Sequence, residues 1–273
     1  MTQTTVGRGA GRPAIAPAYR GYAFDLDGTI YLGDKLIDGA DEVIAALRAT
    51  GARVVFVTNK PLETSADYAS KLSRLGIPTE PADVISALDA LILYLHDRHP
   101  DARLMAIAEP LLIAELQLAG FRTSTDPAQT DVVVVSFDRT FDYEKLTRAY
   151  QAVGAGAVIV ATNPDPYCPT PDGGLPDCAA MLAAIEACTG ARAAAIVGKP
   201  SVHMARAFLD RLGVPADEAV MVGDRLLTDV AMGLDAGMAA ALVMSGATTE
   251  RILAESTVSP TFVLDDVRGL VAH

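Results

Sequence analysis

The chain has 273 residues, of which 51% are hydrophobic, so it can bury the core of one large or two modest domains. Its formal net charge of −12 argues against a nucleic-acid binder, because such proteins normally present a basic face. No apolar run is long enough to span a membrane. The three cysteines lack the spacing of zinc ligands, which predicts reduced thiols in a cytoplasmic protein.

The first half of the chain alternates between apolar runs and helical patterns after a short N-terminal segment. Residues 1–20 hold three arginines, no acidic residue and several Gly and Pro, which predicts a disordered tail. Apolar spacing, glycine stops and an N-cap at Ser86 indicate the elements that follow. Strands are predicted at 21–24, 53–57, 104–107 and 131–135, and helices at 41–49, 64–75, 86–95, 110–118 and 141–153.

The second half repeats this alternation around a loop dense in Pro and Gly at residues 163–176. Strand–helix alternation of this kind is typical of a parallel sheet with helices on both faces, so we expect an α/β protein. Strands are predicted at 157–160, 194–197, 219–222 and 240–243, and helices at 177–188, 201–212 and 227–233.

Two aspartates, one residue apart, follow the first predicted strand in the segment Asp25-Leu26-Asp27-Gly28-Thr29. Asp25 comes first after the strand, where a carboxylate can attack a phosphate in line. Asp27 can then donate a proton to the leaving group and later accept one from water. Gly28 lets a phosphate approach the backbone. The segment predicts aspartate-based phosphoryl transfer, provided that other segments supply the remaining groups.

Three further polar segments end strands or open helices: Thr58-Asn59, Lys199-Pro200, and Gly223-Asp224 with Asp229. Each segment alone has a structural explanation as a turn or a helix start. In open parallel sheets, however, ligands bind at the carboxyl ends of the strands. We therefore expect these segments to converge on one site, and we interpret their ordered placement as catalytic.

A magnesium ion would neutralise phosphate charge at such a site, and it prefers oxygen ligands. We predict that Asp25, the backbone carbonyl of Asp27 and Asp224 hold this ion. Asp229 is predicted to orient Lys199 or the waters of the metal.

The remaining groups are predicted to bind the phosphate directly. Lys199 supplies a cation that holds the nucleophile and the phosphate together. Thr58, the amide of Asn59 and backbone N–H groups near Gly28 can bind the phosphate oxygens.

The spacing of the segments predicts an inserted domain. Only 33 residues separate Asp25 from Thr58, whereas 141 residues separate Thr58 from Lys199. We therefore expect a catalytic core at residues 21–92 and 191–273, with a separate domain inserted at residues 93–190.

Taken together, the four segments resemble the motifs of the haloacid dehalogenase (HAD) superfamily. The fourth segment, Gly223-Asp224-Arg225-Leu226-Leu227-Thr228-Asp229, is similar to that of the NagD-like branch, subfamily IIA. The resemblance covers residues 20 to 270 and implies a Rossmann-like core with a type-2 α/β cap as the insertion. It also implies a homodimer formed through the cap.

The resemblance further implies a magnesium-dependent phosphatase that acts on small phosphorylated metabolites through an aspartyl-phosphate at Asp25. Sugar phosphates are the favoured substrates, with nucleoside monophosphates, phosphoglycolate and pyridoxal phosphate as alternatives. A cap loop containing Asn163, Asp165 and Asp172 is expected to select the substrate.

The chain departs from the family pattern at two positions. Lys60 stands where the family usually has Asn, and Asp177-Cys178-Ala179 replaces a glycine-containing segment. Lys60 either adds positive charge near the phosphate or is a solvated loop residue. The departure at Asp177-Cys178-Ala179 leaves the identity of the substrate open.

Other classes of protein are less consistent with these residues. A phospho-accepting signalling module would not need the second carboxylate, Asp27, which speeds hydrolysis of the intermediate. A glycosyltransferase with a metal-binding Asp-x-Asp leaves Lys199 and Asp224 unexplained. A binding protein without activity would not need intact catalytic carboxylates.

Overall fold

The computed structural model describes residues 19–170 and 173–271. The chain divides into two compact units, one that runs through Val54 and resumes at Val214, and one that spans Val55–Gly213. The predicted tail at residues 1–20 lies outside the described residues except at its last two positions. There, the backbone N–H of Arg20 donates to Glu218 O at 2.8 Å.

The discontinuous unit is built on a parallel sheet. Its strands pair in the order β15-β14-β13-β1, and β1 pairs with β13 in the register Gly21↔Ala219 to Phe24↔Val222. Every residue of β1 and β13 is buried, as expected for strands covered on both faces. The strands are β1 (Gly21–Asp25), β13 (Ala219–Gly223), β14 (Ala239–Val243) and β15 (Phe262–Leu264).

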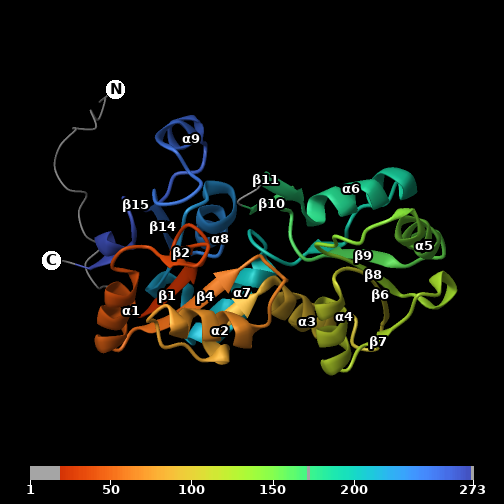
Figure 1. Cartoon of the computed structure of the whole chain (residues 1–273), viewed down its shortest axis with the longest axis horizontal. Helices are drawn as coiled ribbons and strands as arrows, with labels where there is room; N and C mark the ends of the chain where they lie inside the picture. The colour runs from red at the N-terminus through yellow and green to blue at the C-terminus, as the bar shows by residue number, and fades with distance from the viewer. Residues whose placement is uncertain (1–18, 171–172, 272–273) are drawn as a thin grey trace. The chain divides into compact units, whose positions relative to one another are not determined.

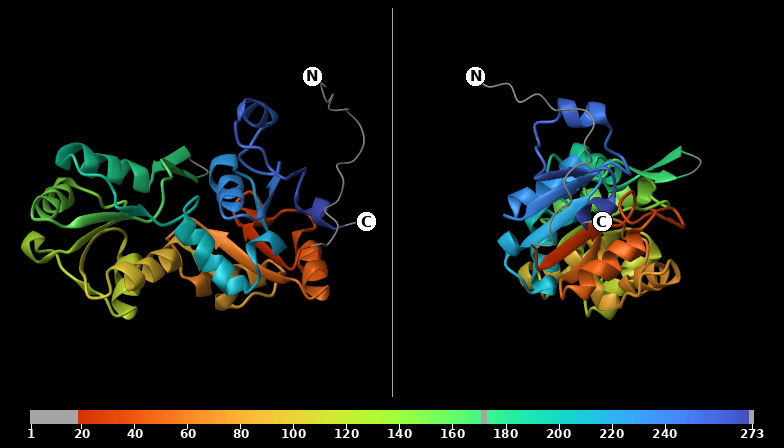
Figure 2. Two further views of the ribbon diagram at one scale, coloured as in Figure 1. Left: turned by 180° about the vertical axis from the view of Figure 1, so that it is seen from behind. Right: turned by 90° about the vertical axis from the view of Figure 1, so that its left-hand side faces the viewer.

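Helices cover both faces of this sheet. The connections that leave β1 and β13 cross the sheet in opposite directions. Because such crossovers are right-handed, the helices α1 and α8 that they contain lie on opposite faces of the sheet (Figure 2). Gly233 of α8 lets this helix approach the side chain of Met221 closely. The other elements of this unit are α1 (Ala40–Ala49), α8 (Ala231–Asp235), α9 (Glu250–Glu255) and the hairpin of β2 (Tyr31–Leu32) and β3 (Lys35–Leu36).

Strand β4 (Arg53–Thr58) begins at the end of the first segment of this unit, where Arg53 N–H donates to Arg20 O. It continues into the second unit, where it pairs in parallel with β5 (Val84–Ser86). Two of the following helices start with capping boxes, at Thr64 and at Ser86, which satisfy their first backbone N–H groups. These helices are α2 (Ser65–Arg74) and α3 (Ala87–Arg98), and α7 (Val202–Leu212) packs beside α3.

The second unit also contains a separate parallel sheet with the strand order β12-β9-β8-β6-β7. Helices α5 and α6 lie together on one face of this sheet and α4 on the other (Figure 1). The strands are β6 (Arg103–Ile107), β7 (Arg122–Thr123), β8 (Val132–Val135), β9 (Val158–Ala161) and β12 (Ala195–Ile196), and the helices are α4 (Pro110–Leu118), α5 (Tyr143–Gly154) and α6 (Cys178–Thr189).

The predicted α/β class, with parallel strands flanked by helices, is confirmed. The prediction of a loop at residues 163–176 is wrong in part, because this segment contains the antiparallel hairpin of β10 (Tyr167–Thr170) and β11 (Gly173–Pro176). Among the described residues, no helix combines the length and the apolar character that crossing a membrane requires. Cys168, Cys178 and Cys188, all within the described residues, form no disulfide.

Candidate active site

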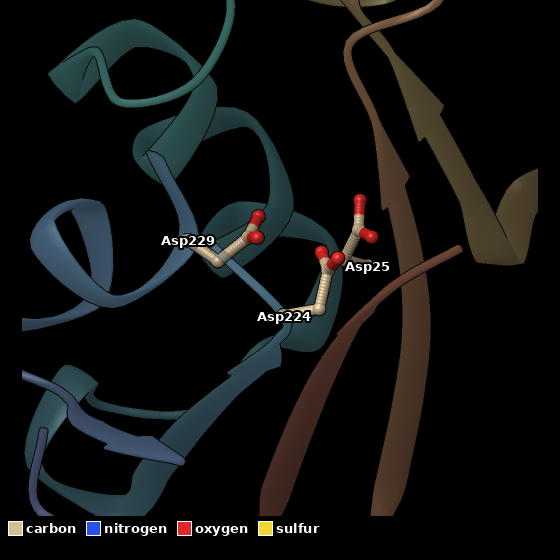
Figure 3. Close-up of side chains that lie close together, drawn as sticks. All are labelled: Asp25, Asp224 and Asp229. Atoms are coloured by element: carbon tan, nitrogen blue, oxygen red, sulfur yellow. The ribbon is translucent and has the colours of Figure 1, made fainter. Parts of the chain in front are cut away.

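Three carboxylates come together in the discontinuous unit. Asp25 is the last residue of β1, Asp224 follows β13, and Asp229 lies in a short π-helix at Leu226–Val230. Because β1 and β13 are adjacent and parallel, their carboxyl ends meet at one edge of the sheet. One carboxylate oxygen from each residue lies within 4.8 Å of the others, and all three residues are buried (Figure 3). We call these three residues the acidic cluster.

A loop after β14 holds Asp224 in place. The Ala247 N–H donates to Asp224 Oδ2 at 2.5 Å, and both the N–H and the hydroxyl of Thr248 donate to the Asp224 carbonyl. Gly28 and Gly246 leave room for this carboxylate, since a Cβ at either position would collide with it. Sequence reasoning missed this loop, although Gly246, three residues after the end of β14, is a signal of close approach.

Asp229 is held from the turn that follows β13. The Arg225 N–H donates to Asp229 Oδ2 at 3.1 Å. Gly223 is required at the end of β13 because a Cβ there would overlap the Asp229 carboxyl group. These contacts hold the Asp229 carboxylate where it belongs to the acidic cluster.

The donor set of the acidic cluster fits a hard divalent cation. Carboxylates buried this close together repel one another, and burying charge is costly without a counter-charge. A bound divalent cation supplies that charge, and donors made only of oxygen are those that Mg²⁺ and Ca²⁺ prefer.

The rest of the segment Asp25–Thr29 lies beside this cluster. Asp27 is half-buried and forms an isolated bridge with Tyr31. Gly28 adopts φ of 88°, a conformation that favours glycine, and its N–H donates to Tyr31 O at 2.8 Å. The Ser245 hydroxyl donates to Gly28 O at 2.7 Å. The N–H of Gly28 is thus engaged in a hydrogen bond within this segment, and phosphate binding near Gly28 stays a prediction.

A second group of predicted residues comes together within the unit that spans Val55–Gly213. Thr58 ends β4, and its hydroxyl accepts the Lys60 N–H at 3.2 Å. Lys199 is 3% exposed, and its Nζ donates to Val57 O at 3.4 Å. Lys199 therefore places its buried amino group close to the end of β4.

Asn59 connects Lys199 with the predicted substrate-selecting loop. Its Oδ1 accepts the Lys199 N–H at 2.7 Å, and its Nδ2 donates to Lys199 O at 3.1 Å and to Asp165 Oδ2 at 3.0 Å. Asn163 Nδ2 donates to Asn59 O at 3.3 Å. The structure therefore brings Asn163 and Asp165 to Asn59, whereas Asp172 lies outside the described residues.

Asp177, one of the two departures from the family pattern, caps α6 in a buried position. Its Oδ1 accepts the Cys178 N–H at 2.6 Å. Burial raises the pKa of Asp177 to about 6; the Cys178 N–H opposes this rise, the Asp165 carboxylate adds to it, and the Lys60 ammonium opposes it. The two departures, Lys60 and Asp177, thus interact electrostatically in the folded chain.

We expect Asp177→Asn to change how stability depends on pH. Because the pKa is raised in the folded state, wild type should lose stability as the pH rises from about 4 to above 6. The variant lacks this loss, so near pH 7 its free energy of unfolding should exceed that of wild type by up to about 3 kcal/mol. Urea unfolding at pH 4 and pH 7 measures the difference. Asp142→Asn, at the exposed N-cap of α5, is the control, and parallel pH curves for wild type and Asp177→Asn would contradict the expectation.

Family models and curated proteins both match this chain. Residues 22–122 match a model described as haloacid dehalogenase-like hydrolase, and residues 196–270 match a second HAD-like model. The chain is 35% identical over 256 residues to the sugar-phosphatase AraL of Bacillus subtilis, covering 94% of this chain and 93% of the relative. It is also 34% identical over 255 residues to an acid sugar phosphatase of Staphylococcus haemolyticus, covering 93% of this chain and 96% of the relative.

Solved structures agree with these matches. A 4-nitrophenylphosphatase from Thermotoga maritima has a TM-score of 0.87 at 33% identity, covering 93% of this chain and 97% of that one. A p-nitrophenyl phosphatase from Archaeoglobus fulgidus has a TM-score of 0.88 at 29% identity, covering 93% and 98%. A structure described under the name nagD has a TM-score of 0.85 at 31% identity, covering 93% and 98%. The chain therefore belongs to the haloacid dehalogenase superfamily, as a phosphatase of its NagD-like branch, subfamily IIA.

Proposed function

We propose that this phosphatase depends on magnesium and hydrolyses phosphate monoesters of small metabolites, sugar phosphates above all, through an aspartyl-phosphate at Asp25. The observation that carries the proposal is the acidic cluster, in which Asp25 ends a buried strand beside Asp224 and Asp229. Relatives that span nearly the whole chain are named sugar phosphatases, which supports sugar phosphates as the substrate class.

In the proposed reaction, a carboxylate oxygen of Asp25 attacks phosphorus, and the bond between phosphorus and the ester oxygen breaks. Asp27 gives its proton to the departing alcohol oxygen. Asp27 then takes a proton from a water molecule that attacks the phosphorus of the aspartyl-phosphate. This second step releases inorganic phosphate and regenerates the Asp25 carboxylate.

The remaining motif residues stabilise charge. Magnesium held by Asp25, the Asp27 carbonyl and Asp224, with Asp229 in support, would neutralise the phosphate. We assign Lys199 and Thr58 to phosphate binding on the match of their segments to the family motifs.

We also propose an organisation for the chain. Residues 93–190 form the inserted cap domain, and residues 21–92 and 191–273 form the catalytic core. The loop with Asn163, Asp165 and Asp172 contacts the part of the substrate beyond the phosphate. A cytoplasmic homodimer that assembles through the cap is the proposed functional state.

A phosphate-release screen tests this function. Purified protein with MgCl₂ is assayed against sugar phosphates, nucleoside monophosphates, phosphoglycolate, pyridoxal phosphate and 4-nitrophenyl phosphate, with EDTA as the control. We expect release from all sugar phosphates tested, a higher kcat/KM for these than for the other metabolites, and loss of activity in EDTA. A preference for a nucleotide or a cofactor phosphate would overturn the substrate assignment. Absence of release from every compound would overturn the function.

A further inference from the structure

The carboxamide of Asn59 has no unused hydrogen in this structure. A carboxamide offers two N–H donors and one carbonyl acceptor. Here Nδ2 donates to Lys199 O at 3.1 Å and to Asp165 Oδ2 at 3.0 Å, and Oδ1 accepts the Lys199 N–H at 2.7 Å. A phosphate oxygen could bind this side chain only if one of these hydrogen bonds were broken.

The surroundings of Asn59 leave little freedom for rearrangement. Asn59 is 9% exposed, and Asn163, which donates to its backbone carbonyl, is fully buried. A Cβ at Gly198 would lie 2.7 Å from Asn59 Oδ1, so the backbone before Lys199 can approach the carboxamide only because this residue is glycine. Buried carboxamides held by three hydrogen bonds fix the segments that they connect.

The hydrogen bonds join three segments that are distant in sequence. Asn59 follows β4, Lys199 follows β12, and Asp165 belongs to the loop after β9. The loop residue Asp165 is itself positioned by its N–H, which donates to Asn163 Oδ1 at 3.0 Å. A displacement of Asp165 therefore shifts the side chain of Asn59, and this shift in turn moves the backbone of Lys199.

We propose that Asn59 is a positioning residue, whose carboxamide couples the placement of Lys199 to that of Asp165, and that this side chain is not a phosphate ligand. The inference rests on the proposed function, in which Lys199 binds phosphate and Asp165 contacts the substrate. It assigns to Asn59 a role different from the phosphate contact that its motif suggests. A substrate seated against Asp165 would then determine where the lysine is held.

An exchange of the two side chains tests this coupling. Asn59→Asp places a carboxylate against Asp165 and removes both donors, so we expect kcat to fall on the order of 100-fold. Asp165→Asn keeps an acceptor for Asn59 and should cost only a few-fold in kcat. In the combined Asn59→Asp, Asp165→Asn variant, the new amide can donate to the new carboxylate. We expect the exchange to restore kcat at least tenfold over Asn59→Asp alone.

The matched control is Asn59→Asp combined with Asp177→Asn. Asp177 is an acidic neighbour of Asp165, so this control removes nearby negative charge without supplying a donor to residue 59. A direct phosphate ligand at Asn59 predicts that Asn59→Asp is impaired regardless of residue 165, because its charge repels the phosphate. Absence of rescue by Asp165→Asn, or equal rescue by Asp177→Asn, would therefore overturn the inference.

Two further measurements separate the inference from its alternatives. If Asn59 acts through Lys199, the rescue should appear in kcat for both a sugar phosphate and 4-nitrophenyl phosphate, whereas rescue of KM alone would count against it. Unfolding free energies of the same variants report the coupling between residues 59 and 165 without reference to turnover, and additive values would also overturn it. Failure of wild type to release phosphate in the screen would instead refute the proposed function.

Discussion

Asp25→Asn is expected to abolish phosphate release while the chain remains folded. The substitution removes the nucleophile but preserves the size of the side chain at the end of β1. We expect kcat to fall by on the order of 10⁴-fold or more, as for nucleophiles in other covalent mechanisms. Since one of three clustered carboxylates loses its charge, the metal-free variant should unfold at the same or a higher denaturant concentration than wild type.

Phosphate release and urea unfolding of the same preparation measure these two effects. Asp235→Asn is a suitable control, because this residue is exposed at the end of α8 in the same unit. Mass spectrometry after rapid acid quenching should detect a phosphorylated peptide containing residue 25 in wild type and not in the variant. Release at the wild-type rate from Asp25→Asn would show that another residue is the nucleophile.

Asp224→Asn is expected to uncouple the stability of the chain from magnesium. In wild type, magnesium at about 100 times its dissociation constant should add about 2.7 kcal/mol to the free energy of unfolding. Asn can still accept the Ala247 N–H, so the loop after β14 should keep its hydrogen bond. It lacks the charge that attracts a cation, so most of the magnesium effect should disappear. Loss of a residue that only supports a metal ligand can already lower activity by about 100-fold. Asp224 is proposed as a direct ligand, so its replacement should lower activity by more than about 100-fold.

Unfolding curves with MgCl₂ and with EDTA measure this coupling. The metal-free variant should match or exceed metal-free wild type, because mutual repulsion within the acidic cluster is reduced. An equal magnesium effect in wild type and Asp224→Asn would show that the ion binds elsewhere. Asp235→Asn serves again as the control, and it should respond to magnesium as wild type does.

The elements that could be predicted are those whose pattern is local. The helix predicted at residues 110–118 occurs with those bounds, because Pro110 starts it and Gly120 follows its end. Ser86 caps α3 as predicted, within a capping box. The hairpin of β10 and β11 was missed because Gly and Pro obscure the alternation of side chains on which strand prediction depends. The π-helix at Leu226–Val230 was predicted as an ordinary helix, since its apolar spacing differs little from that of an α-helix.

The proximity of Asp25 and Asp224 could be predicted because Asp25 ends one strand and Asp224 follows another, and these strands pair in parallel. The hydrogen bonds that hold them could not, because they depend on the path of loops. The Ala247 N–H reaches Asp224 only through the turn after β14. Likewise, nothing in the segment Thr58-Asn59 indicates that its carboxamide faces Asp165, more than 100 positions further along the chain.

The pairing of β1 with β13 has a consequence for biosynthesis. Gly21 and Ala219 are partners in the sheet, so one edge of β1 stays unpaired on the ribosome until almost 200 further residues have been added. At usual rates of translation this takes roughly 10 to 40 s. During that time the apolar side chains of Tyr22 and Phe24, fully buried in the finished protein, lack their final neighbours. The nascent chain therefore presents a natural target for chaperones, and the acidic cluster can form only near the end of synthesis.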